Sequence, residues 1–270
     1  MQLSAKEKTR LLNNYGQWAI ITGASSGIGL ELATQLAEAG FNLVLNSRDP
    51  KKLYEVEKRL NSNQRIETII VASDVSEADG IEKIIQASKG LNVGLLIVSA
   101  GYGTSGSFID TTLDSEINML RVNCEALLKI THHYSQQFSK QKKGGIILMS
   151  SMVAFQGTPY SANYGATKAY VQNLSEALAV ELKPYGVDVL AAAPGPVNSG
   201  FGERANMKMS MSLTPAQVGV PILKALGRKT TVLPGLLTKF LVYLLRTVPR
   251  WGKIKIMANV MGGMTKHQRT

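Results

Sequence analysis

A glycine-rich turn near the amino terminus lies directly between an apolar run and a helical pattern. Trp18–Thr22 is apolar on both alternating faces, which is typical of a strand buried on both sides. Residues 23–29 read GASSGIG, and a helix is expected from there to Ala39. Glycines let the backbone approach a ligand closely, and a helix amino terminus offers N–H donors and a positive dipole. The stretch therefore predicts either a plain turn or a turn that binds pyrophosphate, in an α/β fold.

The alternation of apolar runs and helical patterns continues through the rest of the chain. It predicts a doubly wound, mostly parallel sheet of about seven strands with helices on both faces. We expect residues 1–270 to form one domain, with a helical extension at 1–16 and a basic amphipathic extension at 234–270. A long helix is expected over Leu113–Ser139, and Phe201–Leu213 is expected to be irregular. The further expected strands are Asn42–Asn46, Glu67–Val71, Leu95–Val98, Ile146–Met149, Val187–Ala193 and Thr230–Leu233.

The composition allows a large core and gives no sign of disulfides or metal. The chain has 270 residues, 44% of them hydrophobic, and a mean hydropathy of +0.01, which predicts a soluble globular protein. Its one cysteine, Cys124, lies in an apolar helical pattern and indicates a buried, inert thiol in a reducing compartment. The three histidines lack metal-ligand spacing, so no metal is expected. Ala5–Arg10 is too charged for a signal peptide, and we expect a cytoplasmic protein.

A serine, a tyrosine and a lysine are spaced so that they can meet. Tyr164 and Lys168 are four residues apart on a predicted helix and therefore share a face. A free tyrosine has a pKa of about 10, and a nearby ammonium is expected to lower it. Ser151 follows the strand Ile146–Met149, at the sheet edge where α/β proteins present groups to ligands. Together the three side chains can hold a carbonyl oxygen and protonate it.

The spacing of these residues resembles the active-site signature of the short-chain dehydrogenase/reductase family. Ser151 precedes Tyr164-x-x-x-Lys168 by thirteen residues, and Thr22-Gly23-x-x-x-Gly27-Ile28-Gly29 has the form of that family's cofactor turn. The resemblance covers about Tyr15–Leu226 and includes bacterial 3-oxoacyl and hydroxysteroid-type reductases. It implies a Rossmann sheet and reversible hydride transfer between a nicotinamide and a carbonyl carbon.

The resemblance also implies a role for each matching residue. Tyr164 would act as general acid/base, Ser151 would position the oxygen, and Lys168 would hold the nicotinamide ribose. Asn123, 28 residues before Ser151, would support a water through which the proton is replaced. Ser99 stands where the family usually has asparagine. The positions implied for cofactor binding are Thr22, Gly23, Ser25, Ser26, Gly27, Ile28, Gly29, Asp74, Val75, Ala100, Gly101, Tyr164, Lys168, Pro194, Gly195 and Val197.

The end of the second expected strand bears on the choice of dinucleotide. Family members that prefer NAD place an acid here to bind the ribose hydroxyls, and this chain has Ser47 followed by Arg48. An arginine at this place can pair with a 2′-phosphate. Asp49 can also reach the ribose, but it is followed by proline and reads as a helix cap. NADP(H) is therefore favoured over NAD(H).

Apolar residues near the expected active site indicate a lipophilic carbonyl substrate. Methionines alternate at 207, 209 and 211, which suits a mobile apolar lid, and Val153 follows Ser151 closely. The residues expected to contact substrate are Ser151, Val153, Tyr164 and Met207. A 3-oxoacyl group on an acidic carrier protein is an alternative, since a basic tail can dock such a carrier. A non-catalytic NADP-binding or membrane-associated scaffold of the same fold is an alternative of another class.

The excess of positive charge lies wholly in the last quarter of the chain. Residues 1–203 hold 18 basic and all 19 acidic residues, whereas residues 204–270 hold the other 12 basic residues and no acid. Leu236–Thr247 is apolar around a narrow basic stripe but too short to span a bilayer. It is expected to pack over the substrate pocket or a partner subunit, or to make peripheral membrane contact. Nucleic acid is not expected, since no reading motif accompanies the charge. The family resemblance implies a homodimer or homotetramer.

Overall fold

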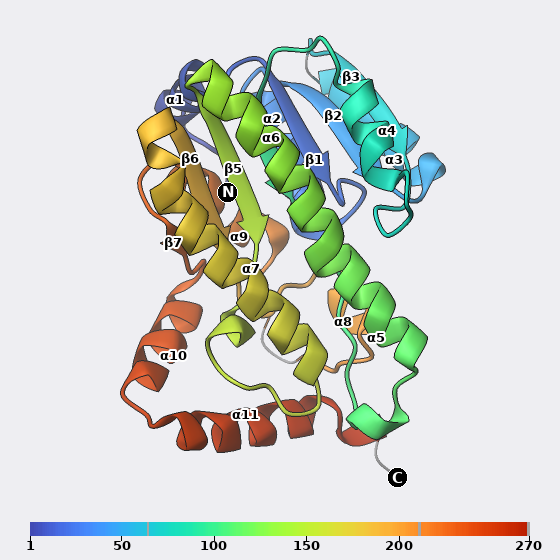
Figure 1. Cartoon of the computed structure of the whole chain (residues 1–270), viewed down its shortest axis with the longest axis vertical. Coiled ribbons are helices and arrows are strands. Elements are labelled where there is room, and N and C mark those ends of the chain that lie inside the picture. Colours follow the sequence, from blue (N-terminus) through green and yellow to red (C-terminus); the bar gives the residue numbers. More distant parts are fainter. Residues whose placement is uncertain (64, 210–211, 269–270) are drawn as a thin grey trace.

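A seven-stranded parallel sheet runs through the part of the chain that the structure describes, residues 1–63, 65–209 and 212–268 of a computed structural model (Figure 1). The strand order is β3-β2-β1-β4-β5-β6-β7, and every pairing in it is parallel. The predicted α/β sheet is therefore confirmed. The strands are β1 (Trp18–Thr22), β2 (Asn42–Ser47), β3 (Thr68–Ala72), β4 (Val93–Val98), β5 (Gly144–Met149), β6 (Val187–Ala192) and β7 (Thr231–Val232).

The sheet reverses its direction of growth between β1 and β4. The chain proceeds from β1 outward to β3 and then returns, so β4 pairs with the other edge of β1. Thr22, at the end of β1, is in register with Asn46 of β2 and Val98 of β4. Ligands of open α/β sheets bind outside the carboxyl ends of the strands at such a reversal. The topology thus places a crevice beside the glycine-rich turn.

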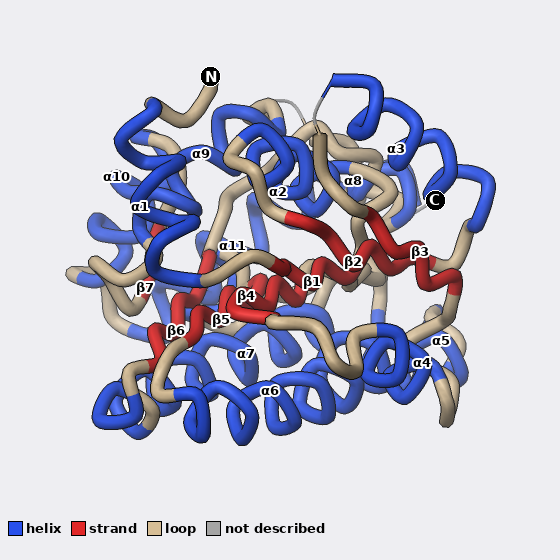
Figure 2. Tube along the Cα trace, turned by 90° about the horizontal axis from the view of Figure 1, so that it is seen from above, coloured by secondary structure: helices blue, strands red, loops and turns tan. Residues whose placement is uncertain are grey.

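Helices cover both faces of the sheet, as Figure 2 shows edge-on. Side chains alternate along β1, where Ala19 and Ile21 join the core under one helical layer and Trp18 and Ile20 the core under the other. The first layer holds α1 (Ala5–Tyr15), α2 (Gly27–Glu38), α3 (Pro50–Asn63) and α9 (Pro215–Ala225). The second holds α4 (Gly80–Ala87), α6 (Leu127–Gln141) and α7 (Ala162–Glu181).

The long helix predicted over Leu113–Ser139 contains a wider turn. It comprises α5 (Leu113–Leu120), a π-helical turn η2 (Arg121–Ala126) and α6. A π turn holds one more residue than an α turn and rotates the side chains that follow. Asn123, in this turn, is thereby directed at the backbone after β4, to which it is hydrogen-bonded. The sequence pattern alone predicted an uninterrupted α-helix.

The amino-terminal extension is fastened to the end of α9. Both terminal nitrogens of Arg10 donate to carbonyls, to Leu226 at 2.9 Å and to Leu223 at 3.0 Å. These carbonyls lack helical partners at a carboxyl terminus, so the guanidinium caps α9. Glu7 accepts a hydrogen bond from Arg228 at 2.7 Å. Helix α1 is thus part of the layer that also contains α2 and α9.

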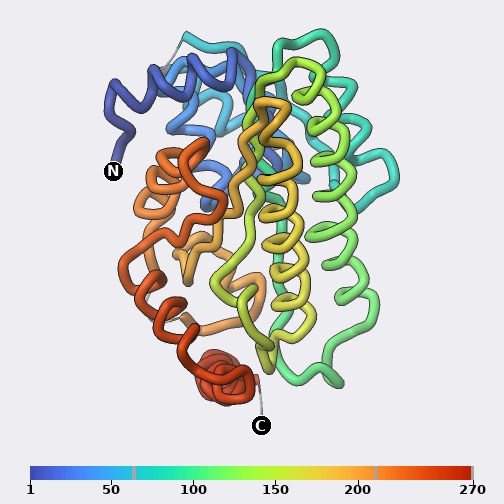
Figure 3. The backbone as a smooth tube through the Cα atoms, turned by 60° about the vertical axis from the view of Figure 1, so that its left-hand side comes forward, coloured from blue at the N-terminus to red at the C-terminus, as the bar shows by residue number. Residues whose placement is uncertain are grey.

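The last part of the chain lies across the carboxyl ends of the strands. Helices α10 (Leu236–Arg246) and α11 (Arg250–Met264) form this cover, with α11 crossing the end of the molecule toward which the strand arrows point (Figure 1). Figure 3 shows α11 nearly end-on at the same place. Helix α11 was not predicted, and Phe201–Leu213, expected to be irregular, begins with the short helix α8 (Phe201–Arg204). Met211 lies outside the described residues. Among those residues no helix has the length and apolar character needed to cross a bilayer.

Candidate active site

A cavity of about 970 Å³ opens at the carboxyl ends of the central strands. The glycine-rich turn after β1 lies on one side, and the cover formed by α10 and α11 lies on the other. Most residues that the sequence predicted for cofactor or substrate line this one cavity. They are Gly23, Ser25, Ser26, Gly27, Ile28, Gly29, Ser47, Arg48, Asp74, Val75, Ala100, Gly101, Ser151, Val153, Tyr164, Lys168, Pro194, Gly195, Val197 and Met207.

The glycines of the glycine-rich turn lie where a side chain would not fit. Gly23 has φ +69°, and a Cβ there would lie 2.8 Å from the backbone nitrogen of Ala100. Gly29 is equally restricted, because its Cβ would meet the carbonyl oxygen of Gly23 at 2.3 Å. Helix α2 begins at Gly27, so its free N–H groups face the cavity. This cradle fits a pyrophosphate, which binds best where the backbone can approach it at a helix amino terminus.

Thr22 supports the turn after β4 and does not line the cavity. Its hydroxyl accepts hydrogen bonds from the backbone nitrogens of Ser99, at 3.2 Å, and Ala100, at 3.1 Å. The side chain is almost fully buried. The prediction of a cofactor contact at Thr22 is therefore corrected: β1 and β4 are neighbours, and the hydroxyl is used to join their ends. The same bonds hold the backbone at Ser99, the position at which the family that the sequence resembles usually has asparagine.

Charged residues surround the cavity at the end of β2. Asp49 caps α3, because its Oδ1 accepts from the backbone nitrogens of Lys51 at 3.0 Å and Lys52 at 3.2 Å. This is the role that the sequence favoured for it. The Arg48 guanidinium is 3.6 Å from a carboxylate oxygen of Asp74 and otherwise largely exposed. Lys52 also lines the cavity, a position that sequence reasoning missed although it is only four residues after Arg48.

The carboxyl group of Asp74 is held ionised beside this arginine. Burial acts to raise the pKa of Asp74, but hydrogen bonds from Ser76 and the charge of Arg48 outweigh it, so the pKa lies below its ordinary value. Both the backbone nitrogen and the hydroxyl of Ser76 donate to Oδ1, at 2.9 and 2.7 Å. Asp74 therefore offers a fixed hydrogen-bond acceptor at the wall of the cavity.

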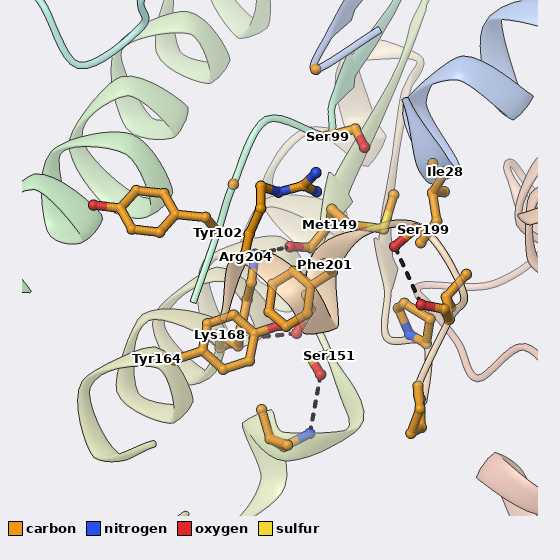
Figure 4. Close-up of a pocket in the computed structure, with 18 of the residues that line it drawn as sticks. Ile28, Ser99, Tyr102, Met149, Ser151, Tyr164, Lys168, Ser199, Phe201 and Arg204 are labelled. Atoms are coloured by element: carbon orange, nitrogen blue, oxygen red, sulfur yellow. Dashed lines mark hydrogen bonds between the residues drawn. The ribbon is translucent and has the colours of Figure 1, made fainter. Parts of the chain in front are cut away.

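Ser151, in the loop that joins β5 to α7, and Tyr164 and Lys168, on α7, line the same part of the cavity (Figure 4). Tyr164 and Lys168 lie one helical turn apart on α7, and both are more than nine-tenths buried. The Lys168 ammonium lies 5.7 Å from the centre of the Tyr164 ring. It donates a hydrogen bond to the Met149 carbonyl at 2.9 Å. The predicted meeting of three polar side chains at this edge is what the structure shows.

The acidity of the phenol differs from the sequence-based expectation. Burial raises the pKa of Tyr164 to about 12, against a hydrogen bond with Ser151 that lowers it. Burial lowers the pKa of Lys168 to about 8. The predicted lowering of the tyrosine pKa by Lys168 is therefore corrected: the ammonium is directed at the Met149 carbonyl, and burial of the phenol raises its pKa. The phenol is protonated at neutral pH, which is the form that can donate a proton.

Asn123 lies behind the cavity and holds its wall. Its Oδ1 accepts from the backbone nitrogen of Tyr102 at 3.1 Å, and its Nδ2 donates to the Tyr102 carbonyl at 2.8 Å and to Thr167 Oγ1 at 3.1 Å. A Cβ at Gly101 would lie 3.0 Å from Asn123 Oδ1 and 3.4 Å from Lys168 Nζ. The residue therefore fixes the backbone at Gly101, close to Lys168, and these three bonds compensate a polar side chain buried within a helix.

The cover supplies an apolar wall that sequence reasoning found only in part. Phe201 of α8 packs on Tyr164, with 5.3 Å between ring centres. The sequence left open whether Leu236–Thr247 packs over the pocket, and the structure places four of its five leucines in the cavity wall. The contribution of α11 was missed, because apolar residues occur all around that helix and give no amphipathic signal. The cover lines the cavity with Leu237, Leu241, Leu244 and Leu245 of α10 and with Ile256 and Val260 of α11, among others.

Comparison with known proteins assigns this fold and site to a class. The sequence model of the short chain dehydrogenase family matches residues 17–210. This chain belongs to the short-chain dehydrogenase family and is an oxidoreductase that acts between the alcohol and carbonyl oxidation levels. The family resemblance noted from the sequence is confirmed.

Particular relatives lie in two groups. A 7beta-hydroxysteroid dehydrogenase of Collinsella aerofaciens is 30% identical over 232 residues, which are 83% of this chain and 88% of that one. A very-long-chain 3-oxoacyl-CoA reductase of Podospora anserina is 41% identical over 179 residues, 64% of this chain and 53% of that one.

Among solved structures, one from a study of 7beta-hydroxysteroid dehydrogenase stereoselectivity has a TM-score of 0.85 at 28% identity. The match covers 92% of this chain and 99% of the chain in that structure. A Sphingobium yanoikuyae short-chain dehydrogenase in complex with NADPH has a TM-score of 0.78 at 26% identity. The match covers 87% of this chain and 97% of the Sphingobium chain.

Proposed function

We propose that this chain is an NADP(H)-dependent oxidoreductase that interconverts a lipophilic ketone and its alcohol. The observation that carries the proposal is one continuous cavity. It joins the glycine cradle to the hydroxyls of Ser151 and Tyr164 and continues between apolar walls from the cover. A cofactor phosphate, a reacting oxygen and a hydrophobic substrate body each find a matching surface there.

The chain's own residues provide proton transfer and positioning. Tyr164, protonated at neutral pH, donates its proton to the developing alkoxide of the substrate. The Ser151 hydroxyl holds that oxygen, and Lys168 places a positive charge beside it, which stabilises the negative charge that forms. Asn123 acts as a positioning residue through Gly101. When bound, the nicotinamide supplies the hydride.

The preference for NADP(H) rests on the end of β2. Arg48 and Lys52 line the cavity there, and the nearest acid, Asp49, is engaged as a helix cap. Two cations and no free carboxylate favour a 2′-phosphate over ribose hydroxyls. The Sphingobium yanoikuyae neighbour in complex with NADPH, and a Beutenbergia cavernae neighbour with bound NADP at 26% identity, support this choice. Ser47, with its hydroxyl at the same edge, completes the proposed site.

The proposed substrate class is a hydrophobic carbonyl of steroid or long-chain acyl type. Relatives with those two activities by name, together with the leucines and methionines of the cavity, support it. Val153 and Met207 are proposed as substrate contacts. The intact Ser151, Tyr164 and Lys168 group speaks against a non-catalytic scaffold. A homodimer or homotetramer in the cytoplasm, with peripheral membrane contact, stays a prediction.

The test is NADPH oxidation measured against ketones graded from short, water-soluble chains to steroids and long-chain acyl compounds. Turnover is expected to rise with apolar size. Tyr164→Phe is expected to reduce kcat at least about a thousandfold while NADPH binding, followed by fluorescence, persists. Tyr170→Phe, on the same helix but outside the cavity, is the matched control. Unchanged turnover in Tyr164→Phe would remove the proposed mechanism.

A further inference from the structure

The inward face of the cover, residues 236–268, is already packed against the rest of the chain or lines the cavity. Val242 of α10 packs with Leu233 and with Met152 and Phe155 of the loop after β5. Met257 and Met261 of α11 pack with Met207 and Phe201. These contacts hold the two helices over the carboxyl ends of the strands (Figure 3). Apolar residues on the outward side of the same helices are therefore not needed for packing within the chain.

The mouth of the cavity has an apolar rim that is open to solvent. Leu237 and Leu244 of α10 line the cavity yet are 50% and 52% exposed, and Ile256 and Val260 of α11 are 42% and 44% exposed. Further out, large apolar side chains are exposed by more than half: Leu236, Phe240, Tyr243 and Trp251. Exposed apolar surface continuous with a ligand pocket marks a place of contact with a partner or a membrane.

This rim is surrounded by positive charge without any acid. The cover holds Lys239, Arg246, Arg250, Lys253, Lys255 and Lys266 and no Asp or Glu. Within the described residues, no ion pair involves these six cations. Arg246 lies 4.8 Å from the Tyr243 ring and Lys255 lies 5.4 Å from the Trp251 ring. Aromatic rings with cations beside them suit the boundary between lipid tails and headgroups.

The charge distinguishes among possible occupants of this surface. A second copy docking through the same face would bring the same cations with no acid to pair them, and the two covers would repel each other. An anionic lipid surface pairs the cations and buries the apolar rim at once. Because α10 and α11 are both too short to span a bilayer, contact would be confined to one leaflet.

We propose that the cover docks on the surface of an anionic bilayer, with the cavity mouth facing the lipid. The inference rests on the proposed function, since a lipophilic ketone partitions into the bilayer and would enter the cavity from there. Phe240, Trp251 and Leu236 insert among the acyl chains, and the six cations contact lipid phosphates and carboxylates. The same helices thus form the inner wall of the substrate pocket and the membrane-binding surface.

The experiment is flotation with phosphatidylcholine vesicles, with or without about one-third phosphatidylserine. The wild-type protein is expected to float with the anionic vesicles and to be released as salt is raised. Phe240→Ser with Trp251→Ser, both outside the cavity lining, should weaken binding at least about tenfold. Lys239→Glu with Lys255→Glu should abolish the preference for anionic vesicles. Matched controls are Val180→Ser, exposed near the far end of α7, and Lys140→Glu with Lys143→Glu, and these should float like the wild type.

The outcomes separate this proposal from the proposed function. Turnover of a water-soluble ketone, measured without vesicles, tests the enzyme alone and should be unchanged in the Phe240/Trp251 variant. Turnover of a vesicle-borne ketone should fall in that variant in proportion to binding. Failure of the wild type to float on anionic vesicles overturns the membrane proposal, whatever the turnover. A dimer that the Phe240/Trp251 variant dissociates, without flotation of the wild type, would assign the face to a second copy and overturn it too.

Discussion

The Lys168 ammonium donates its hydrogen bond to the carbonyl of Met149, the last residue of β5, at 2.9 Å. Burial lowers the pKa of this lysine to about 8, so it is charged at neutral pH and loses its proton as pH rises through that value. The proposed reduction needs the positive charge, since it stabilises the developing alkoxide. We expect kcat/KM for reduction to be constant below about pH 8 and to fall roughly tenfold per unit above it.

Lys168→Arg is the control for this assignment. A guanidinium stays protonated over the whole range, so the decline near pH 8 should disappear even if the variant is slower. The measurement is the pH profile of kcat/KM for NADPH-dependent ketone reduction. A decline that persists unchanged in Lys168→Arg would assign the titration to another group.

A second prediction concerns the cations at the end of β2. Arg48→Ala and Lys52→Ala are each expected to raise the KM for NADPH about tenfold or more, because each removes a charge-assisted contact to the 2′-phosphate. The KM for NADH should change less than about twofold. Lys51→Ala is the control, because Lys51 directly precedes Lys52 in the chain but does not line the cavity. Equal effects on both dinucleotides would refute the assigned preference.

A third prediction tests Asn123 as a positioning residue. Asn123→Ala removes the side-chain partner of the half-buried Tyr102 nitrogen and carbonyl, and it removes one of the two hydrogen bonds of the buried Thr167 hydroxyl, which keeps its bond to the Tyr164 carbonyl. The free energy of unfolding should fall by about 2 to 3 kcal/mol, and Tm by roughly 5–10 °C. At temperatures where the variant is folded, kcat should fall more than KM for NADPH changes. The exposed amide of Asn173 donates to the Ala169 carbonyl of its own helix, and Asn173→Ala should leave both stability and kcat unaltered.

A fourth prediction concerns close backbone packing at the start of β4. A Cβ at Gly94 would lie 1.7 Å from the carbonyl oxygen of Tyr15, and neither backbone can yield easily. Gly94→Ala should therefore cost at least about 3 kcal/mol in urea unfolding or prevent folding. Gly263→Ala, in α11 with nothing within 4 Å of the added carbon, should stabilise by up to about 1 kcal/mol. Similar urea midpoints for Gly94→Ala and Gly263→Ala would contradict the close backbone packing described at Gly94.

Sequence reasoning succeeded where function depends on local spacing. Tyr164 and Lys168 share a helical face because they are four residues apart, and the glycine turn must follow β1 because the apolar run ends there. The strand and helix alternation likewise allowed the sheet to be predicted. These features are set within one segment of the chain, and the same segment reveals them.

It failed where a role depends on residues distant in the chain. Thr22 was predicted as a cofactor contact because nothing local shows that Ser99 and Ala100 lie beside it. The acidity of Tyr164 was misjudged because its burial comes from tertiary packing around α7 and α8. The π turn that directs Asn123 to its partners has no local signature that distinguishes it from α-helix.

The apolar wall of the cavity comes largely from one stretch at the end of the chain, whereas the glycine cradle comes from its beginning. The sheet itself is completed at β7, before α10 starts. Residues 236–268 thus contribute no strand and no part of the cradle. If the proposed function holds, changes in this one terminal segment would alter which ketones are accepted, while the choice of dinucleotide would be set by Arg48 and Lys52 in the first half of the chain.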